Sequence, residues 1–201
     1  LTVGYDRIPL IKNINLGVRP GEILTLIGPN GSGKSTFLKT IVGKIPALSG
    51  EYRFGTNVQI GYFDQQMAMY TSNKTVLDDF WDEYPNLTET EARNALGAFL
   101  FSGEDVFKNV NMLSGGEKVR LALCKILKTR PNVLVLDEPT NHMDIVGKET
   151  LESMLKDYKG TLIFVSHDRY FVKKVATQLL VFEDGTTKLY QFGYEQYQEK
   201  L

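Results

Sequence analysis

The sequence predicts an α/β fold with a mainly parallel core sheet, an antiparallel β subdomain and an inserted α-helical subdomain. The apolar segment 22–27 has the pattern of a buried strand and runs into a glycine-rich turn, which is followed by a helical pattern. After Pro131, strand and helix patterns alternate, as is typical of parallel strands joined by right-handed crossovers. Between these two regions the pattern is mainly helical. The three observations together indicate one domain, residues 1–201, with a helical subdomain at about 66–130 inserted in the α/β core.

The first half of the chain supplies the elements around the glycine-rich turn. Residues 35–42 carry apolar side chains at the spacing of one helical face, and Gly43 is a plausible stop. Tyr5 falls at the end of a short strand. The alternating stretch 57–62 predicts short antiparallel strands with one face in solvent, which need not join the parallel sheet.

The second half supplies the helical insert and the alternating strands and helices. In the helical segment 75–108, Thr88 and Glu91 have the spacing of a capping box. A second amphipathic helix begins after Ser114-Gly115-Gly116. Four further elements are predicted after Pro131: a strand at 133–136, a helix at 145–158, a strand at 161–165 and a helix at 169–175.

Composition restricts the class of protein. Hydrophobic residues make up 42% and charged residues 23% of the chain, and the formal net charge is -1. A nucleic-acid contact would therefore need a local patch or a segment outside this chain. Cys124, the single cysteine, is expected to be a buried thiol without chemistry, and no apolar run is long enough to cross a bilayer. The chain begins with Leu1 rather than methionine, which suggests a piece of a longer protein, and we expect a cytoplasmic location.

The segment Gly28 to Thr36 reads GPNGSGKST and matches the P-loop pattern, with the required strand before it and helix after it. It predicts the P-loop NTPase form of the α/β fold. Backbone N–H groups of such a loop face a phosphate, while Lys34 would reach the β- and γ-phosphate oxygens and Ser35 would bind Mg²⁺. A plain glycine-rich turn is the weaker alternative. The predicted nucleotide-binding residues here are Asn30, Gly31, Ser32, Gly33, Lys34, Ser35 and Thr36.

The strand at 133–137 ends in two acids, Asp137 and Glu138. Carboxylates at the C-terminal end of a parallel strand lie beside the ligand crevice. Asp137 would support Mg²⁺ through its water shell, and Glu138 would polarise the attacking water as general base. An exposed acidic turn is the alternative reading.

A further motif resembles one that is typical of a known protein family. LSGGE at 113–117, upstream of VLVLDEPTNHMD at 133–144, resembles the signature motif and Walker B segment of ATP-binding cassette (ABC) proteins. The resemblance implies an ATPase that uses ATP and Mg²⁺, with Tyr5 stacking on adenine, although a core tyrosine is an alternative. It also implies a D-loop at Asp144 with His142 as its scaffold.

Two further site residues follow from this resemblance. Gln65 falls at the Q-loop, where its amide could reach Mg²⁺ or the attacking water, but Gln66 is adjacent and the register stays open. His167 falls at the switch position, where its imidazole could donate to the γ-phosphate and hold the water with Glu138. The predicted catalytic residues are thus Glu138, His167 and Lys34, and the predicted metal-binding residues are Ser35, Gln65 and Asp137.

The signature residues have a separate expected role. The resemblance implies that Ser114, Gly115 and Gly116 close over the ATP held by the P-loop of a partner, so an isolated domain should bind ATP but hydrolyse it poorly. Without the resemblance, this segment is only a capped helix start.

Finer details resemble the ABC-F branch, and in particular its second cassette. The segments that carry this resemblance are Glu117, TNHMD at 140–144, SHDRYF at 166–171, GYFDQ at 61–65 and GYEQY at 193–197. Met143 departs from the leucine that is common there. The resemblance implies a protein with two cassettes, in cis or as a homodimer, which contacts ribosomes or RNA through segments absent from this chain and does not insert in membranes.

Three functions stay open at this point. The first is a soluble ATPase whose closure gates ribosome binding. The second is the motor domain of a transporter, which would dock a membrane partner on residues 75–108. The third is a sensor that uses ATP mainly to dimerise, with little turnover.

Overall fold

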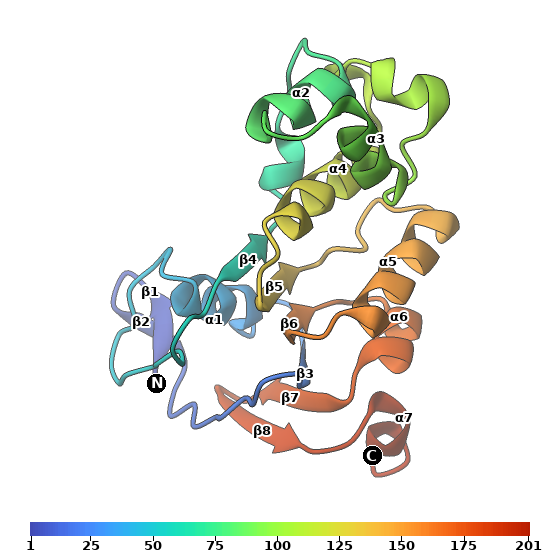
Figure 1. Ribbon diagram of the computed structural model, residues 1–201. Coiled ribbons are helices and arrows are strands. Elements are labelled where there is room, and N and C mark those ends of the chain that lie inside the picture. Colours follow the sequence, from blue (N-terminus) through green and yellow to red (C-terminus); the bar gives the residue numbers. More distant parts are fainter.

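A six-stranded sheet forms the centre of the computed structural model, which describes all residues 1–201 (Figure 1). The strand order is β4-β5-β6-β3-β7-β8, and all neighbours are parallel except β7 and β8, which are antiparallel. The strands of this sheet are β3 (Ile23–Ile27), β4 (Ile60–Phe63), β5 (Val133–Asp137), β6 (Thr161–Val165), β7 (Gln178–Glu183) and β8 (Thr186–Tyr190). The predicted mainly parallel α/β core is therefore confirmed.

The helices lie around this sheet and at one end of it. The α-helices are α1 (Lys34–Ile41), α2 (Val76–Glu83), α3 (Glu89–Gly97), α4 (Gly115–Lys128), α5 (Ile145–Asp157), α6 (Arg169–Val175) and α7 (Tyr194–Gln198). Three short 3-10 helices complete the set: η1 (Met67–Met69), η2 (Gly103–Phe107) and η3 (Val110–Met112). None of these helices has the length and apolar character that a bilayer crossing requires.

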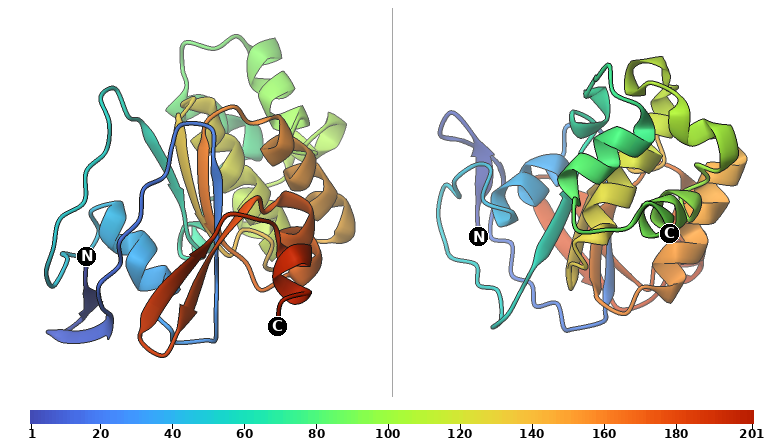
Figure 2. Two further views of the ribbon diagram at one scale, coloured as in Figure 1. Left: turned by 90° about the horizontal axis from the view of Figure 1, so that it is seen from below. Right: turned by 45° about the horizontal axis from the view of Figure 1, so that its top comes forward.

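Two hydrophobic cores lie on opposite faces of the sheet, because successive side chains of a strand point to opposite sides. On β5, Val133 and Val135 belong to one core, whereas Leu134 and Leu136 belong to the other. The first core contains the buried face of α1, and the second contains the buried faces of α4, α5 and α6. Figure 2 shows the sheet between these two layers.

The strand β4 corrects one expectation from the sequence. Residues 57–62 were expected to form short antiparallel strands that need not join the parallel sheet, but β4 pairs in parallel with β5, with Ile60 opposite Val133 and Phe63 opposite Leu136. The alternation has a simple cause, since β4 is an edge strand in which buried and more exposed residues alternate. A half-covered edge of a parallel sheet gives the same pattern as an antiparallel strand.

A separate two-stranded antiparallel sheet contains β1 (Val3–Tyr5) and β2 (Ile8–Ile11). Its turn, Asp6-Arg7, has positive φ at both residues, as a two-residue hairpin of type I′ requires. The expected strand end at Tyr5 is confirmed. The hairpin packs beside α1.

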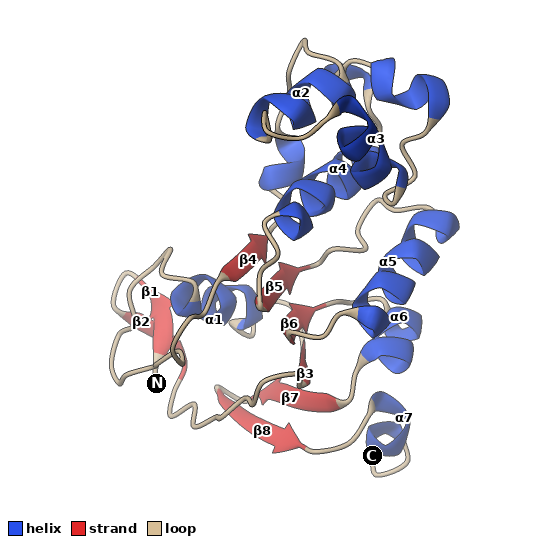
Figure 3. Ribbon diagram, viewed as in Figure 1, coloured by secondary structure: helices blue, strands red, loops and turns tan.

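The helices α2, α3 and α4 gather beyond one end of the sheet, as Figure 3 shows in blue. The capping box predicted at Thr88 and Glu91 is present at the start of α3, and a second one joins Ser114 and Glu117 at the start of α4. Each box satisfies backbone N–H groups that a helix start would otherwise leave unpaired. Cys124 is buried in α4, as expected.

Candidate active site

The P-loop of residues 28–36 leads from β3 into α1, and its glycines are required by its shape. Gly28, Gly31 and Gly33 all have positive φ, of 148°, 76° and 96°. A side chain at Gly28 would collide with the carbonyl oxygen of Phe182, and one at Gly33 would approach Ile11 in the hairpin to 3.0 Å. Glycine tolerates these conformations without a steric cost. The loop therefore has the curled backbone that presents N–H groups to a phosphate.

The Lys34 side chain is enclosed by its own loop. Its ammonium group donates hydrogen bonds to the carbonyl oxygens of Gly28 and Pro29, both at 2.7 Å, and to the Ser32 hydroxyl at 3.2 Å. Burial lowers the pKa of Lys34, and the nearby carboxylates of Glu138 and Asp137 oppose that shift. A compact cation with flexible donors is thus held in the phosphate loop.

The remaining predicted P-loop residues divide into exposed and buried ones. Asn30, Gly31 and Ser35 are exposed, and Ser32 is half-buried. Thr36 is buried in α1, where its carbonyl oxygen accepts a hydrogen bond from the Thr40 hydroxyl.

Asp137 lies at the C-terminal end of β5, next to the P-loop. Burial raises the pKa of Asp137, and a hydrogen bond from Ser35 opposes the rise. Its Oδ1 atom is buried and has no hydrogen-bond partner. Mg²⁺ at phosphate sites is held by one or two protein oxygens together with phosphates and water, so a hydroxyl and an unsatisfied carboxylate oxygen at this place fit that ion.

Glu138 is held in an unusual conformation beside His167. Its φ of 53° is rare for a residue other than glycine, and such strain often marks a functional position. One side-chain oxygen, Oε2, accepts a hydrogen bond from the backbone N–H of His167 at 3.1 Å. The other, Oε1, lies 3.0 Å from Nε2 of His167 but off the line of a hydrogen bond. Burial raises the pKa of Glu138, and the contact with His167 opposes the rise.

The structure brings Gln65 rather than Gln66 to this cluster. The Gln65 side-chain amide donates a hydrogen bond to the backbone carbonyl of Glu138. Gln66 is exposed, and its backbone N–H donates to Asp64. The side chain at position 65 is thus the one that reaches the end of β5.

Tyr5 lies at the end of β1 and is 44% exposed, so it is not a core residue. The other strand of its hairpin contacts the P-loop, because Ile11 lies against Gly33. An exposed aromatic ring on this hairpin is available as a stacking surface beside the phosphate loop.

Several residues around this cluster have no role predicted from the sequence. A cavity of about 310 Å³ is lined by Lys34 and His167 together with Arg169 and Tyr194. Arg169 and Tyr194 were quoted only as parts of longer motifs, and no local signal showed that they face Lys34. Nearby, the Thr140 and Ser166 hydroxyls form a buried hydrogen bond of 3.2 Å that ties the loop after β5 to the end of β6.

The signature residues Ser114, Gly115 and Gly116 lie apart from this cluster, at the start of α4. α4 belongs to the core on the opposite face of the sheet from α1. Ser114 is exposed and caps the helix. A side chain at Gly116 would meet the carbonyl oxygen of His142 at 2.6 Å, so the signature packs directly on the predicted D-loop of its own chain.

Asp144, at the other end of that loop, caps α5. Its Oδ1 accepts a hydrogen bond from the backbone N–H of Gly147 at 2.8 Å. The signature and the D-loop therefore lie together in one region of the surface, and the P-loop cluster lies in a separate region.

Comparison with known proteins gives the family. The family model described as "ABC transporter" matches residues 11–141. The Bacillus subtilis protein YdiF is 50% identical over 201 residues, which is all of this chain and 31% of that protein. ABC transporter F family member 5 of Arabidopsis thaliana is 42% identical over 98% of this chain and 29% of that protein. The chain thus spans about a third of the length of these relatives.

Solved structures agree on the fold. A dimeric structure of MJ0796, a bacterial ABC transporter cassette, superimposes with a TM-score of 0.74 at 24% sequence identity, covering 92% of this chain and 91% of that one. A dimeric post-hydrolysis structure of the same cassette, bound to ADP and Pi, gives a TM-score of 0.73 at 23% identity over the same shares of the two chains. The chain belongs to the ABC transporter family of ATP-binding domains, and the relatives that match it over nearly its whole length include members of the F family.

Proposed function

We propose that this chain binds MgATP and hydrolyses it in a closed head-to-tail pair with a second cassette. The observation that carries the proposal is the arrangement of Lys34, Asp137, Glu138, His167 and Gln65. They come from four separate segments of the chain and meet at the C-terminal ends of β3, β5 and β6 and the adjacent end of β4. This is the edge at which open α/β sheets bind ligands.

The proposed chemistry is the attack of water on the γ-phosphate. The water oxygen forms a bond to the γ-phosphorus while the bond from that phosphorus to the β–γ bridging oxygen breaks, which yields ADP and phosphate. Glu138 accepts the proton of the water, and the backbone N–H of His167 orients its carboxylate. Lys34 contacts the β- and γ-phosphate oxygens. Bound Mg²⁺, held by Ser35 and Asp137, would neutralise phosphate charge.

The second half of the site would come from a partner. Ser114, Gly115 and Gly116 form a helix start at which Ser114 and Gly115 are exposed, and such a start favours an anion. α4 packs in the core on the opposite face of the sheet from α1. We therefore propose that the signature residues at its start cover the nucleotide of another cassette rather than their own. The two similar solved structures are described as dimeric, which agrees with this arrangement.

The biological target is proposed from the F-branch motifs. Because these motifs resemble those of proteins that act on ribosomes, we propose a cytoplasmic protein whose ATP-driven closure gates binding to the ribosome. The net charge of -1 gives this chain no bulk attraction for RNA, so the contact would be made by other segments of the longer protein. The chain covers about a third of its relatives, and a second cassette in the same polypeptide is part of this proposal.

A trapping experiment tests the proposal. The Glu138→Gln variant of the full-length protein is incubated with MgATP, and its partners are recovered at ordinary salt. Co-purification of ribosomes, dependent on ATP and absent for Lys34→Ala, supports the proposal. Recovery of a membrane protein would instead indicate a transporter motor. Recovery of nothing but further copies of the chain would indicate a dimerising sensor.

A further inference from the structure

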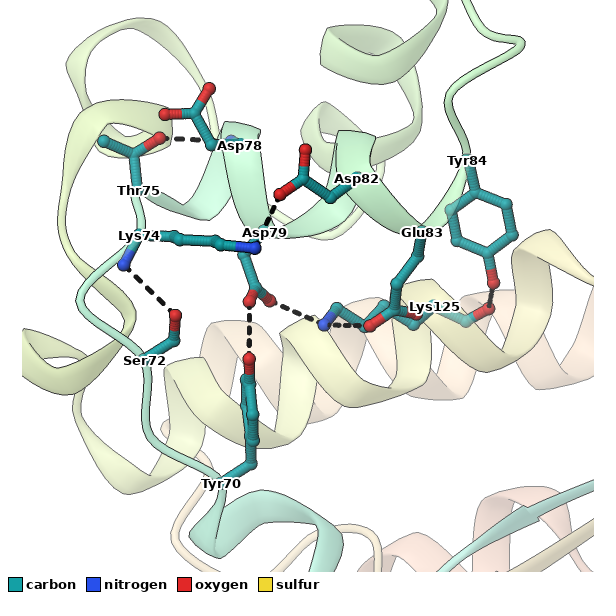
Figure 4. Close-up of polar contacts among 10 residues, drawn as sticks. All are labelled: Tyr70, Ser72, Lys74, Thr75, Asp78, Asp79, Asp82, Glu83, Tyr84 and Lys125. Atoms are coloured by element: carbon teal, nitrogen blue, oxygen red, sulfur yellow. Dashed lines mark hydrogen bonds and ion pairs between the residues drawn. The ribbon is translucent and has the colours of Figure 1, made fainter.

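A polar cluster around the buried Asp79 joins three segments outside the candidate active site (Figure 4). Asp79 on α2 is only 4% exposed, although it is charged. Its Oδ1 accepts a hydrogen bond from the Tyr70 hydroxyl at 2.7 Å, and its Oδ2 pairs with the Lys125 ammonium at 2.6 Å. Lys125 also pairs with Glu83 at 2.6 Å and lies over the ring of Tyr70. Every polar atom at the centre of the cluster thus has a partner.

The three joined segments have different roles. Tyr70 lies on the segment that begins at Gln65 and continues through η1, which packs on α4. Lys125 lies in α4, the helix that starts at the signature residue Gly115. Asp79 lies between them on α2. The cluster therefore connects the segment that touches Glu138 with the helix that presents the signature.

The cluster lies beside a groove between α4 and the sheet. Tyr70 and Lys125 line a groove of about 510 Å³, which Ile60 and Gly61 of β4 also line. The groove lies beside the contact between α4 and β4, where a Cβ at Gly61 would meet Ile126 of α4 at 2.7 Å. A buried ion pair contributes little net stability compared with apolar side chains of the same volume, but its hydrogen bonds are satisfied in one geometry only.

We propose that Tyr70, Asp79 and Lys125 are positioning residues that fix the signature helix α4 relative to Gln65. The inference rests on the proposed function, because it assigns this cluster the task of aligning Ser114 with the nucleotide of the partner cassette. Ser114 lies eleven residues before Lys125, about 16 Å along the helix axis. A small tilt of α4 at Lys125 therefore moves Ser114 by a larger amount.

The position of the signature can be measured directly with spin labels. Labels are placed at Met112→Cys, which is 76% exposed and two residues before Ser114, and at Thr186→Cys, an exposed position on β8. Cys124 is buried and burial raises its pKa to about 12, so it does not compete for the label. Without nucleotide, we expect one narrow distance distribution in the otherwise unmodified chain and a broader or shifted one in Tyr70→Phe and in Lys125→Met.

A matched control is available next to the cluster, where Lys74, two residues before the start of α2, contacts that helix. Lys74 pairs with Asp82 at 2.7 Å, but this pair is exposed (Figure 4). Lys74→Met should therefore leave the distance distribution unchanged. Tyr70→Phe removes one hydroxyl and leaves the ion pair, so it serves where Lys125→Met fails to fold. If both variants fold and give the distribution of the unmodified chain, the positioning role is overturned.

Kinetics separate this role from a purely structural one. In the full-length protein we expect Tyr70→Phe to leave the dissociation constant for ATP unchanged and to lower kcat about tenfold, the effect of one lost hydrogen bond to a charged group. A loss of folded protein alone would lower the active fraction without changing kcat per ATP-binding site. Equal kcat in Tyr70→Phe and the unmodified protein would overturn the inference. If the unmodified protein neither binds nor hydrolyses ATP, the proposed function fails instead, and the label distances still decide the positioning role.

Discussion

The carboxylate of Glu138 lies against His167 through both of its oxygens, one bonded to the backbone N–H at 3.1 Å and the other 3.0 Å from Nε2 of the imidazole. This arrangement holds the carboxylate in one orientation at the end of β5. A base that is already oriented does not need to be ordered during the reaction. The first two predictions depend on this pair.

Replacing Glu138 by glutamine should separate binding from hydrolysis. Glutamine keeps an oxygen that can accept the bond from the His167 N–H, but its amide is not a base. We expect ATP binding to be retained and turnover to fall about 100-fold or more, because general-base catalysis contributes on that order. Equilibrium nucleotide binding and single-turnover hydrolysis measure the two effects. Normal hydrolysis by Glu138→Gln in a competent pair would show that another group is the base.

The pH dependence of turnover should reflect the titration of Glu138. Because burial raises the pKa of Glu138, the carboxylate should lose its basic form at a higher pH than an ordinary glutamate does. We expect turnover to fall as the pH falls through that raised pKa. The control is Glu149→Gln, at an exposed position on α5, which should leave this fall of turnover at acidic pH unchanged. A fall of turnover centred at the pKa of an ordinary glutamate would contradict the assignment of Glu138 as the general base.

Stability should follow the opposite trend. Since the folded pKa of Glu138 lies above the unfolded one, the folded state binds the proton more tightly. This group therefore disfavours folding most above its raised pKa, and the effect disappears as the pH falls to the unfolded value of about 4.3. We expect Glu138→Gln to be more stable than the unmodified protein at neutral pH, with a difference that shrinks at acidic pH. Urea denaturation at a series of pH values measures it.

Loss of Lys34 should abolish tight nucleotide binding. Lys34 is the ammonium group enclosed by the P-loop, where three oxygens of the loop hold it. Lys34→Ala removes the point charge that would contact the β- and γ-phosphates. Titration calorimetry with ATP measures the effect, and Lys156→Ala, at an exposed lysine of α5 that pairs with Glu152, is the control. Unchanged affinity in Lys34→Ala would place the nucleotide elsewhere.

The contact between Gly116 and His142 can be tested with a single methyl group. In Gly116→Ala the new Cβ would meet the carbonyl oxygen of His142 at 2.6 Å, so the helix start and the loop at 140–144 must move apart. We expect a loss of about 1–3 kcal/mol in the free energy of unfolding, as for other overpacked sites. Thermal and urea unfolding measure it.

Gly97→Ala is the matched control for that substitution. The Cβ at this position, in the last turn of α3, would have no neighbour within 4 Å. Alanine in a helix should stabilise the protein by about 0.5–1 kcal/mol. Equal effects of the two substitutions would contradict the close packing of the signature on the D-loop.

Local signals made much of the fold predictable. The helix starts at Thr88 and Ser114 are fixed by side chains three residues away, so the sequence displays them directly. β6 and α6 also have the predicted bounds, since β6 is a continuous buried run and Asp168 caps the start of α6. The partner of β4 was not visible in this way, because Ile60 pairs with Val133, 73 residues later.

The active site was predictable to a similar limit. Motif spacing pointed to Lys34, Asp137 and Glu138, the family resemblance pointed to His167, and the fold brings the four together. Whether Gln65 or Gln66 faces the site depends on how the chain leaves β4, which a pattern of residue types does not encode. The pairing of Asp79 with Lys125 was equally hidden, because the two residues are 46 positions apart and each is ordinary in its own helix.

The edge strands of the main sheet are short, which limits how copies of this chain can associate. One edge is β4, which has four residues, and the other is β8, which has five and carries the exposed Lys188 near its middle. Short edges and an edge lysine disfavour the addition of a strand from a neighbouring molecule. The proposed cycle of closure and opening would require such edges, because backbone pairing along an open edge would lead to aggregates that nucleotide exchange could not reverse.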